Sequence, residues 1–412
     1  MTTVDLVFEG GGAKGMVFVG ALEELLRSGQ YQPGRLMGTS AGAITATILA
    51  AGYTPTEMLE ALAEHDDLGQ SVFSAFLGVP EPLTREAVQD SAIRHLLKRL
   101  DIPLLPGALE DRLDSWLVEQ LAGLPSARHL FSFVDRGGWF AADAFVTWMA
   151  RRLNTGSFRG QPRAFGAMTF EEFYAATGAE LTLVTSDTTW SRMLLLNHRT
   201  APKCPVVWGT RMSMSIPLLW QEVIWQPEWG PYYSWDAASR SLNPKDIAGH
   251  CLVDGGMLSN FPLALFMSTT SDVAAVLGAE RGDEIVGLLI DEALRVPHCP
   301  DFPPASFLLQ TLGALTTVQR LERLVSTAIG ANDNFAIALF ARHVVRLPAG
   351  GYGTTQFNLT DAERQPLVDA GREPMLAYLA RRAEEKELGA PKDLGAPNLV
   401  ALANLAAASM LP

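Results

Sequence analysis

The chain has 412 residues, of which 48% are hydrophobic and 19% are charged, so its composition is that of a globular protein with one large core or two smaller ones. A formal net charge of −13 argues against nucleic-acid binding and against adsorption of the whole surface to anionic lipid, because both favour basic patches. The three cysteines, Cys204, Cys251 and Cys299, form no C-x-x-C pair, which fits a reducing compartment and argues against a disulfide or zinc framework.

The first fifty residues alternate between strand and helix patterns. Val4 to Phe8 predicts a buried strand, and a glycine-rich loop, Gly10 to Gly15, follows it. A helix is expected from about Met16 to Ser28, then a short strand from Arg35 to Met37, and a second helix that begins at Ala41. Strand, helix, strand, helix is the pattern of a parallel, doubly wound α/β sheet.

One uncharged stretch, Leu36 to Thr56, is as long as a membrane span. It contains a serine, several threonines and the glycines of a turn, so we interpret it as a buried strand followed by a helix. The first residues run directly into a strand and lack the basic and apolar pattern of a secretory signal. We therefore expect a cytoplasmic protein whose contact with a membrane, if it has one, is peripheral.

Residues 66–178 are mostly helical in pattern, with scattered prolines. Candidate helices are Arg85 to Lys98, Leu109 to Leu121 and Ala142 to Leu153, and Thr169 with Glu172 forms a capping box for another. We interpret this block as a helical insertion that caps the site.

Strand patterns return after the insertion, at Glu180 to Ser186, Met193 to Asn197, Cys251 to Val253, Glu284 to Ile290 and His343 to Leu347. A long amphipathic helix is expected at Ala305 to Ile329, and a last long helix from the capping box of Thr360 and Glu363. We predict one catalytic domain, 1–387, and a C-terminal tail, 388–412. The tail is uncharged from Leu394 onward and could dock on the body, enter a membrane or stay loose.

Gly38-Thr39-Ser40-Ala41-Gly42 fits the Gly-x-Ser-x-Gly pattern of a nucleophile elbow. The first glycine permits a sharp turn, and the second keeps side chains away from the helix that follows. A strand precedes Ser40 and a helix begins after it, so the N–H groups and positive dipole end of that helix face the serine. This context favours a serine that acts as a nucleophile.

The loop from Gly10 to Gly15 also matches the Gly-x-Gly-x-x-Gly pattern of dinucleotide sites. Such a site needs an acidic residue at the end of the second strand, where this chain has Arg35-Leu36-Met37 and then the elbow. A phosphate-binding P-loop fails as well, because Lys14 is not followed by serine or threonine. We therefore interpret the loop as an oxyanion hole for acyl transfer.

The common α/β-hydrolase triad does not fit the order of elements. Several strands precede the elbow in that fold and a catalytic histidine comes last, whereas one strand and one helix precede Ser40 here. None of the seven histidines lies in a glycine-framed turn, and His250 is the best of them because it is close to Asp254. Asp254 itself ends an apolar strand and is followed by two glycines, so its carboxylate can project into a site.

These motifs together resemble the patatin-like phospholipases. The resemblance rests on Glu9 to Gly15, Gly38 to Gly42 and Asp254-Gly255-Gly256, in that order and spacing, and it extends from about Val4 to near Glu385. The segment Arg211 to Pro217 also looks like the family's serine- and proline-bearing helix start. The resemblance implies a three-layer α/β/α fold with a mostly parallel central sheet and, in this chain, a largely helical insertion.

The resemblance further implies a Ser-Asp dyad. Ser40 would attack an ester carbonyl, Asp254 would act as general base without a histidine, and the N–H groups of Gly10, Gly11 and Gly12 would bind the oxyanion. The residues expected to shape this site are Gly38, Thr39, Ala41 and Gly42 of the elbow and Lys14, Gly15, Gly255 and Gly256 around it. The chemistry needs no cofactor or metal, and no carboxylate cluster suggests calcium.

The substrate is expected to be a lipid or another acyl ester. Five tryptophans and two tyrosines fall between Trp208 and Trp235, and aromatic residues of this kind line acyl pockets, favour membrane interfaces or pack in a small core. Pro217, Leu218, Leu219 and Trp220 are the candidates for the acyl pocket wall. A carboxylesterase for small soluble esters, and a nucleotide-binding signalling module, are the alternatives that the sequence leaves open.

Overall fold

The computed structural model describes residues 1–65, 71–81, 91–92, 125–302, 334, 336–354, 356–387 and 397–411. Its centre is an eight-stranded sheet in the order β14-β13-β1-β2-β6-β12-β9, with β7 pairing to β6. The strands of this sheet are β1 (Thr2–Phe8), β2 (Tyr31–Thr39), β6 (Leu181–Asp187), β7 (Arg192–Leu196), β9 (Val223–Ile224), β12 (Cys251–Asp254), β13 (Glu284–Arg295) and β14 (Val344–Gly350).

The sheet is parallel over five of these strands. β14, β13, β1, β2 and β6 run in the same direction, whereas β7 and β12 are antiparallel to β6 and β9 is antiparallel to β12. Among the described residues, three two-stranded sheets lie outside it: β3 (Gly138–Phe140) with β8 (Leu218–Trp220), β4 (Ser157–Phe158) with β5 (Gln161–Pro162), and β10 (Tyr232–Asp236) with β11 (Ser241–Lys245).

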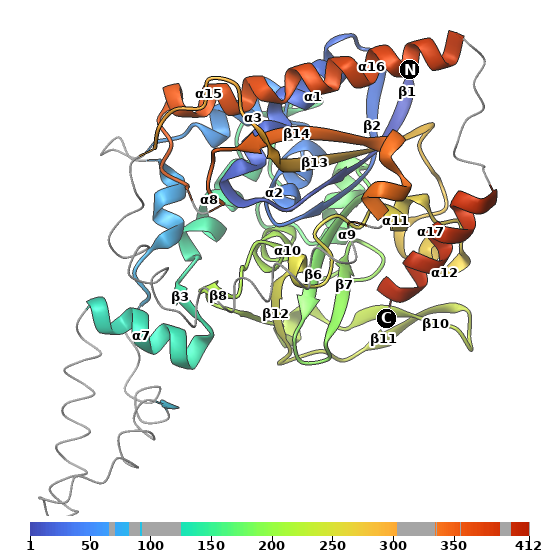
Figure 1. Ribbon diagram of the computed structural model, residues 1–412. Helices are drawn as coiled ribbons and strands as arrows, with labels where there is room; N and C mark the ends of the chain where they lie inside the picture. Colours follow the sequence, from blue (N-terminus) through green and yellow to red (C-terminus); the bar gives the residue numbers. More distant parts are fainter. Residues whose placement is uncertain are drawn as a thin grey trace, which may run out of the picture.

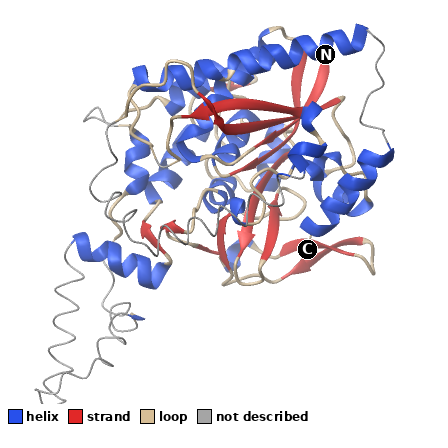
Figure 2. Cartoon of the chain, in the orientation of Figure 1, coloured by secondary structure: helices blue, strands red, loops and turns tan. Residues whose placement is uncertain are grey.

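Helices cover both faces of the central sheet (Figure 2). They are α1 (Val17–Arg27), α2 (Ala41–Ala50), α3 (Pro55–Leu62), α7 (Pro125–Arg136), α8 (Asp143–Leu153), α9 (Phe170–Thr177), α10 (Val206–Ser213), α11 (Leu263–Met267), α12 (Ser271–Leu277), α15 (Asp361–Ala370), α16 (Arg372–Glu387) and α17 (Pro397–Met410). The 3-10 helices include η1 (Gly12–Met16), η2 (Val72–Leu77) and η4 (Gly255–Met257).

Two hydrophobic cores lie on opposite faces of the sheet because side chains alternate along a strand. In β1, Leu6 and Phe8 belong to the core shared with α1, α2, α15 and α16, whereas Val7 belongs to the core shared with α11, α12 and α17. Figure 1 shows these two groups of helices on either side of the strands. The expected three-layer α/β/α fold with a mostly parallel sheet is therefore confirmed.

The short-range predictions agree with the structure closely. The first strand, the two helices around the elbow and α8 lie where the patterns place them. The capping box of α9 is present, with Thr169 Oγ1 accepting from the Glu172 N–H and Glu172 Oε2 accepting from the Thr169 N–H. The helices predicted at 109–121 and 305–329, and the one at 85–98 apart from residues 91–92, lie outside the described residues.

Several boundaries were predicted wrongly; β2, for example, begins at Tyr31 and not at Arg35. The helix that begins after Thr360 is two helices, α15 and α16, because the Gly371 N–H donates to the Val368 carbonyl, three residues back, and ends the α-helical hydrogen-bond pattern. β13 continues beyond Ile290 to the exposed Arg295, which pairs with Gly350 of β14 after a register shift. Backbone pairing, not the apolar run, sets the end of this strand.

The C-terminal tail docks on the body, one of the outcomes that the sequence left open. Ala403 and Ala407 of α17 are buried in the core that contains α11. Asn404 Oδ1 accepts hydrogen bonds from Ser268 Oγ and from the Thr269 N–H, both at 2.9 Å. Within the described part of the chain, no helix is both long and apolar enough to cross a bilayer.

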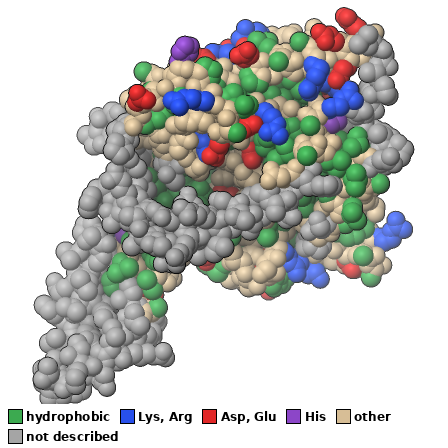
Figure 3. Space-filling model, in the orientation of Figure 1, with side chains coloured by type: hydrophobic (Ala, Val, Ile, Leu, Met, Phe, Trp, Pro, Cys, Tyr) green, Lys and Arg blue, Asp and Glu red, His purple; other side chains and the backbone are tan. Residues whose placement is uncertain are grey.

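The face that carries α15 and α16 mixes both signs of charge. Basic and acidic side chains are interspersed over it in the space-filling view (Figure 3). Several of them are paired, including Arg372 with Glu23 and Lys386 with Glu284. The net negative charge of the chain is therefore not expressed as a single-sign field on this face.

Candidate active site

Ser40 lies in a strained turn between β2 and α2. Its φ of 53° and ψ of −119° are unusual for a residue with a side chain, which fits a nucleophile elbow. Such a turn needs small neighbours, because a Cβ on Gly38 would collide with the Gly42 carbonyl and a Cβ on Gly42 would collide with the Phe8 carbonyl. The serine is 5% exposed and directly precedes the N-terminus of α2.

The sheet register brings Ser40 and Asp254 together. β7 occupies one edge of β6, so β2 and β12 share the other edge and approach each other end to end. Thr39 of β2 pairs with Val184, and Asp254 of β12 pairs with the next residue, Thr185. Two segments far apart in the sequence thus end at adjacent positions on one strand.

The carboxyl group of Asp254 is buried, and burial raises its pKa to about 7. Two hydrogen-bond donors, the Ser40 hydroxyl and the Gly256 N–H, act in the opposite direction because they favour the ionised form. Asp254 Oδ1 accepts the Gly256 N–H at 2.8 Å. Oδ2 has no partner of standard hydrogen-bond geometry among the described residues, so it is the atom best placed to accept a proton.

The end of α10 supports both halves of the site. The Ser40 N–H donates to Ser213 Oγ at 3.1 Å, and Ser213 Oγ donates to the Val184 carbonyl at 2.6 Å. The Asp254 N–H donates to the Ser215 carbonyl at 2.9 Å. The sequence indicated a helix start at this serine-bearing segment, but α10 ends at Ser213, so that interpretation is corrected.

A buried cation holds this segment in place. The Arg211 guanidinium donates to Ser215 Oγ and, at 2.8 Å, to the Gln221 carbonyl. Burial lowers the pKa of Arg211 to about 10. Sequence reasoning noticed the segment but assigned no role to Ser213, Ser215 or Arg211, because a serine in a loop is also an ordinary turn residue.

The glycine loop passes beside Ser40 with two N–H groups pointing to no acceptor among the described residues, those of Gly11 and Gly12. The Gly10 N–H is taken, because it donates to the Asn260 carbonyl at 3.2 Å. Gly12 has a positive φ of 57°, and a Cβ there would collide with the Thr354 carbonyl. Buried Lys14 ends in an ion pair with Glu292 of β13, which holds the loop to the sheet.

The remaining glycines named from the sequence lie at close contacts. A Cβ on Gly15 would be 2.8 Å from the Ala41 side chain, so the loop packs directly on the first residue of α2. Gly255 lies against the Val184 carbonyl, at the point of β6 where β2 and β12 meet. These glycines therefore let the glycine loop and the Asp254 turn pack closely against α2 and β6.

His250 lies elsewhere. Its Nδ1 is 2.8 Å from Asp187 Oδ2, and its ring meets Trp190 edge to face. No hydrogen bond is assigned between a histidine of the described residues and Ser40 or Asp254. The arrangement around Ser40 is thus that of a serine with a carboxylate and not that of a serine with an imidazole.

An apolar cavity of about 40 Å³ opens beside Ser40. Its lining residues are almost all apolar and include Met16, Ile44, Leu62, Phe73, Phe76, Met214, Trp220 and Phe357. Trp220 is the one residue of the predicted acyl pocket wall that lines it; Pro217, Leu218 and Leu219 do not. The volume holds only a few water molecules, so a longer chain would enter only if the aromatic walls moved.

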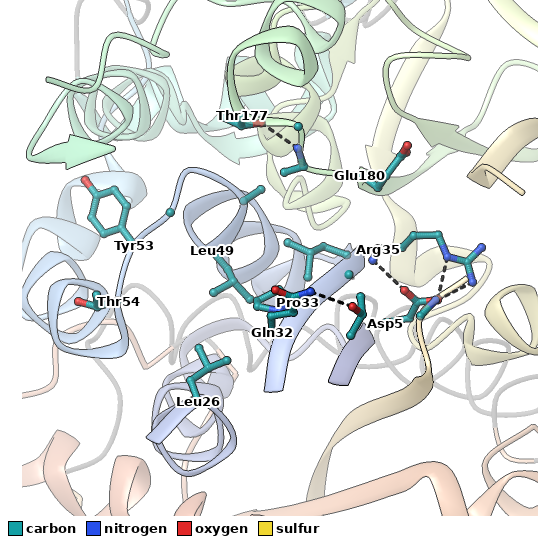
Figure 4. Close-up of a pocket in the computed structure, with 18 of the residues that line it drawn as sticks. Asp5, Leu26, Gln32, Pro33, Arg35, Leu49, Tyr53, Thr54, Thr177 and Glu180 are labelled. Carbon is teal, nitrogen blue, oxygen red and sulfur yellow. Dashed lines mark hydrogen bonds and ion pairs between the residues drawn. The ribbon is translucent and has the colours of Figure 1, made fainter. Parts of the chain in front are cut away.

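A larger groove, of about 960 Å³, lies at the opposite end of the parallel strands (Figure 4). It is lined by the starts of β1 and β2 and by the residues before β6 and β13. Its buried charges are paired, because Arg35 donates to Asp5 Oδ2 at 2.7 and 2.8 Å. Ligands of open α/β sheets bind at the carboxyl ends of strands, where Ser40 lies, and this groove is at the other end.

The sequence is similar to that of known proteins. The family profile described as patatin-like phospholipase matches residues 6–267. A relative from Bacillus subtilis (strain 168), the uncharacterized protein YqhO, is 26% identical over 376 residues, which cover 90% of this chain and 95% of the relative.

Among the described residues, no group of three or more histidine, cysteine or acidic side chains could hold a metal ion.

Two solved structures were matched to most of this chain. VipD from Legionella pneumophila is 15% identical with a TM-score of 0.42, over 92% of this chain and 66% of that one. The type III effector protein ExoU, from Pseudomonas aeruginosa, is 16% identical with a TM-score of 0.36, over 93% of this chain and 53% of that one. The chain spans less than two thirds of either protein. On the profile match, which covers more than half of its residues, this chain belongs to the patatin-like phospholipase family.

Proposed function

We propose that the protein is a lipid acyl hydrolase that cleaves fatty acyl esters, of the phospholipase A or lysophospholipase type, with Ser40 as nucleophile and Asp254 as general base. Membership of the family supports lipid hydrolysis as the class of activity. The observation that carries the assignment to these two residues is their meeting at Val184 and Thr185 of β6, together with an aspartate pKa near 7.

In the proposed reaction, Asp254 Oδ2 takes the proton of the Ser40 hydroxyl while Oγ attacks the ester carbonyl. The tetrahedral oxyanion accepts hydrogen bonds from the N–H groups of Gly11 and Gly12, and the dipole of α2 favours its charge. As the carbon–oxygen bond breaks, the leaving alcohol receives the proton from Asp254. Water then transfers a proton to the carboxylate and attacks the acyl-enzyme. As the bond from the acyl carbon to Ser40 Oγ breaks, Oγ takes that proton from Asp254, which releases the fatty acid and restores both residues.

An elevated aspartate pKa suits this role. A carboxylate with the usual pKa of 3.8 is too weak a base to accept the proton of an alcohol efficiently, and a pKa near 7 brings it closer to the alcohol while leaving it ionised in much of the protein at neutral pH. Burial destabilises the ionised carboxylate, and hydrogen bonds from the Gly256 N–H and the Ser40 hydroxyl partly offset this effect.

The substrate's acyl group is expected to occupy the apolar cavity beside Ser40. Its lining offers hydrocarbon contact and almost no hydrogen-bonding group, which suits an alkyl chain and not a polar acyl group. Two of its aromatic walls, Phe73 and Phe76, come from η2. This supports our view that residues 66–178 contribute a cap, within a catalytic unit spanning 1–387.

The small volume of the cavity favours one other candidate, a carboxylesterase for short soluble esters. The two functions share the same chemistry and differ in the acyl chain. Activity confined to acetyl and butyryl esters, with none on micellar phospholipid, would select the esterase. Release of long-chain fatty acid from phospholipid or lysophospholipid would select the lipase.

The direct test is a fluorophosphonate probe, which reacts with an activated serine. Wild type should be labelled and S40A should not, whereas labelling that persists in S40A would reject the assignment of the nucleophile. Digestion of a total lipid extract by wild type and by D254N, followed by lipid analysis, then identifies the substrate and tests the base. S239A, in the exposed turn between β10 and β11, is a matched control for S40A.

A further inference from the structure

Asn260, which follows the turn at Asp254, forms hydrogen bonds with both the backbone N–H and the backbone carbonyl of Gly10. The Asn260 carbonyl accepts the Gly10 N–H at 3.2 Å, and Asn260 Nδ2 donates to the Gly10 carbonyl at 2.9 Å. A backbone unit with its donor and its acceptor held by the same partner has little freedom to rotate. Gly10 immediately precedes Gly11 and Gly12, whose N–H groups have no acceptor among the described residues.

The same side chain continues the contact to β13. Asn260 Nδ2 is also 3.2 Å from Glu9 Oε1, and Glu9 Oε2 accepts the Ile290 N–H at 2.6 Å. Both carboxylate oxygens of Glu9 therefore accept hydrogen bonds. Through Glu9, the segment after Asp254 is tied to the loop and to the strand beside it.

The amide of Asn260 lies between the glycine loop and the Asp254 turn. A Cβ on Gly10 would collide with Asn260 Oδ1 and would be 3.0 Å from the Ser40 Cβ. A Cβ on Gly256 would be 2.9 Å from the same Oδ1 and 3.1 Å from Asp254 Oδ1. Asn260 thus lies beside both members of the proposed dyad.

We propose that Asn260 is a positioning residue that sets the glycine loop against the Asp254 turn, so that the oxyanion donors and the general base keep their relative geometry. This inference rests on the function proposed above. Preorganised donors stabilise a transition state only when they are aimed at the developing charge, and one misplaced donor typically costs about 10²–10³ in turnover. The carboxamide is needed because it donates to Gly10 and Glu9 through its nitrogen.

The sharpest test is N260D, which keeps the shape of the side chain and removes the donor. A carboxylate at this position cannot donate to the Gly10 carbonyl or to the Glu9 carboxylate and is repelled by both. The loop therefore loses the two hydrogen bonds that position it. We expect kcat on a soluble ester to fall by about 100-fold while KM changes less than threefold, because the acyl cavity is untouched. The rate of fluorophosphonate labelling of Ser40 should fall in parallel.

A second variant restores the hydrogen bond between residues 9 and 260 with donor and acceptor exchanged. In E9Q/N260D the amide and the carboxylate swap places, so a nitrogen at residue 9 can donate to an oxygen at residue 260. We expect this pair to recover about tenfold in kcat over N260D. N243D is the matched control, because Asn243 Nδ2 donates to Asp236 in the β10–β11 hairpin, outside the site, at 2.9 Å.

The results separate three cases. Wild-type kcat in folded N260D overturns the inference, and so does a loss that E9Q/N260D does not recover while its thermal unfolding matches wild type. If N260D fails to fold, kcat of folded E9Q/N260D is compared with that of wild type by the same measure. If the double variant also fails to fold, Asn260 is needed for folding and the inference is overturned. Failure of the proposed function is distinct, because wild type itself would then be inactive or unlabelled at Ser40.

Discussion

The backbone N–H of Ser40 donates to Ser213 Oγ, and the same oxygen donates to the Val184 carbonyl of β6. The elbow is thus held to the strand that also pairs with Asp254. We expect S213A to lower turnover about tenfold and unfolding free energy by about 1–3 kcal/mol, because two buried polar groups lose their partner and the strained turn loses its support. Urea unfolding and ester turnover measure the two effects, and S239A serves as control.

That prediction fails if S213A matches wild type in both measurements. A loss of stability with full turnover would mean that the Ser40 turn keeps its geometry without the hydroxyl. Because Ser213 does not touch the cavity beside Ser40, KM should stay near the wild-type value.

The pH dependence of turnover should report the raised pKa of Asp254. The proposed mechanism needs Asp254 to be ionised, so kcat/KM should rise about tenfold per pH unit below pH 7 and level off above it. Rates on an uncharged ester between pH 5 and pH 9 measure this profile. A half-maximal rate near pH 4 would show that the carboxylate has its ordinary pKa, contrary to the burial of the group.

The same shift predicts a pH-dependent gain in stability for D254N. The folded-state pKa of about 7 exceeds the unfolded value of 3.8. The free energy of unfolding of the wild type is therefore highest below pH 4, where Asp254 is protonated in both states, and it falls as the pH rises toward 7. D254N has no proton to lose and should unfold at a higher temperature than wild type at pH 8. The difference should shrink on acidification to pH 4, and a constant difference would contradict the linkage.

D246N is the matched control for that experiment. Asp246 is exposed, and its Oδ1 accepts the Ala248 N–H, a bond that an amide oxygen can also accept. Its substitution should leave the pH dependence of the melting temperature unchanged.

Chain-length preference should change in F76L. Phe76 walls the cavity beside Ser40 and packs against Phe73, Phe145 and Trp148, so a smaller side chain enlarges the space for an acyl chain. We expect the preferred chain to lengthen, with a gain in kcat/KM of about fourfold for each methylene that becomes buried. A series of 4-nitrophenyl esters measures the shift.

The control for F76L is F158L. Phe158 packs on Phe165 and lines the groove at the other end of the strands. Its substitution should cost stability without moving the preferred chain length. An unchanged preference in F76L would place the acyl chain outside this cavity.

Local features of the fold were predictable from the sequence because their causes are local. The buried strand before Gly10 and the turn at Ser40 follow from glycine spacing and short apolar runs. The capping boxes at Thr169 and Thr360 also form as expected. Each of these depends on residues within one or two turns of chain.

Long-range features could not be predicted in the same way. The meeting of β2 and β12 on one edge of β6 depends on strand register, which no short pattern encodes. The roles of Ser213 and Asn260 depend on it too, because a serine at a helix end and an asparagine in a loop look like ordinary structural residues until the strands are assembled. The closeness of Asn260 to the Asp-Gly-Gly motif was the signal that could have drawn attention to it.

The arrangement at β6 has a consequence for the synthesis of this protein. A ribosome releases the elbow long before β12, and a nascent chain that ends before Asp254 has the proposed nucleophile without the proposed general base. Hydrolytic competence should therefore arise late, when β12 closes against β6, and recovery of activity during refolding would time that closure and not the earlier collapse around β1 and α1.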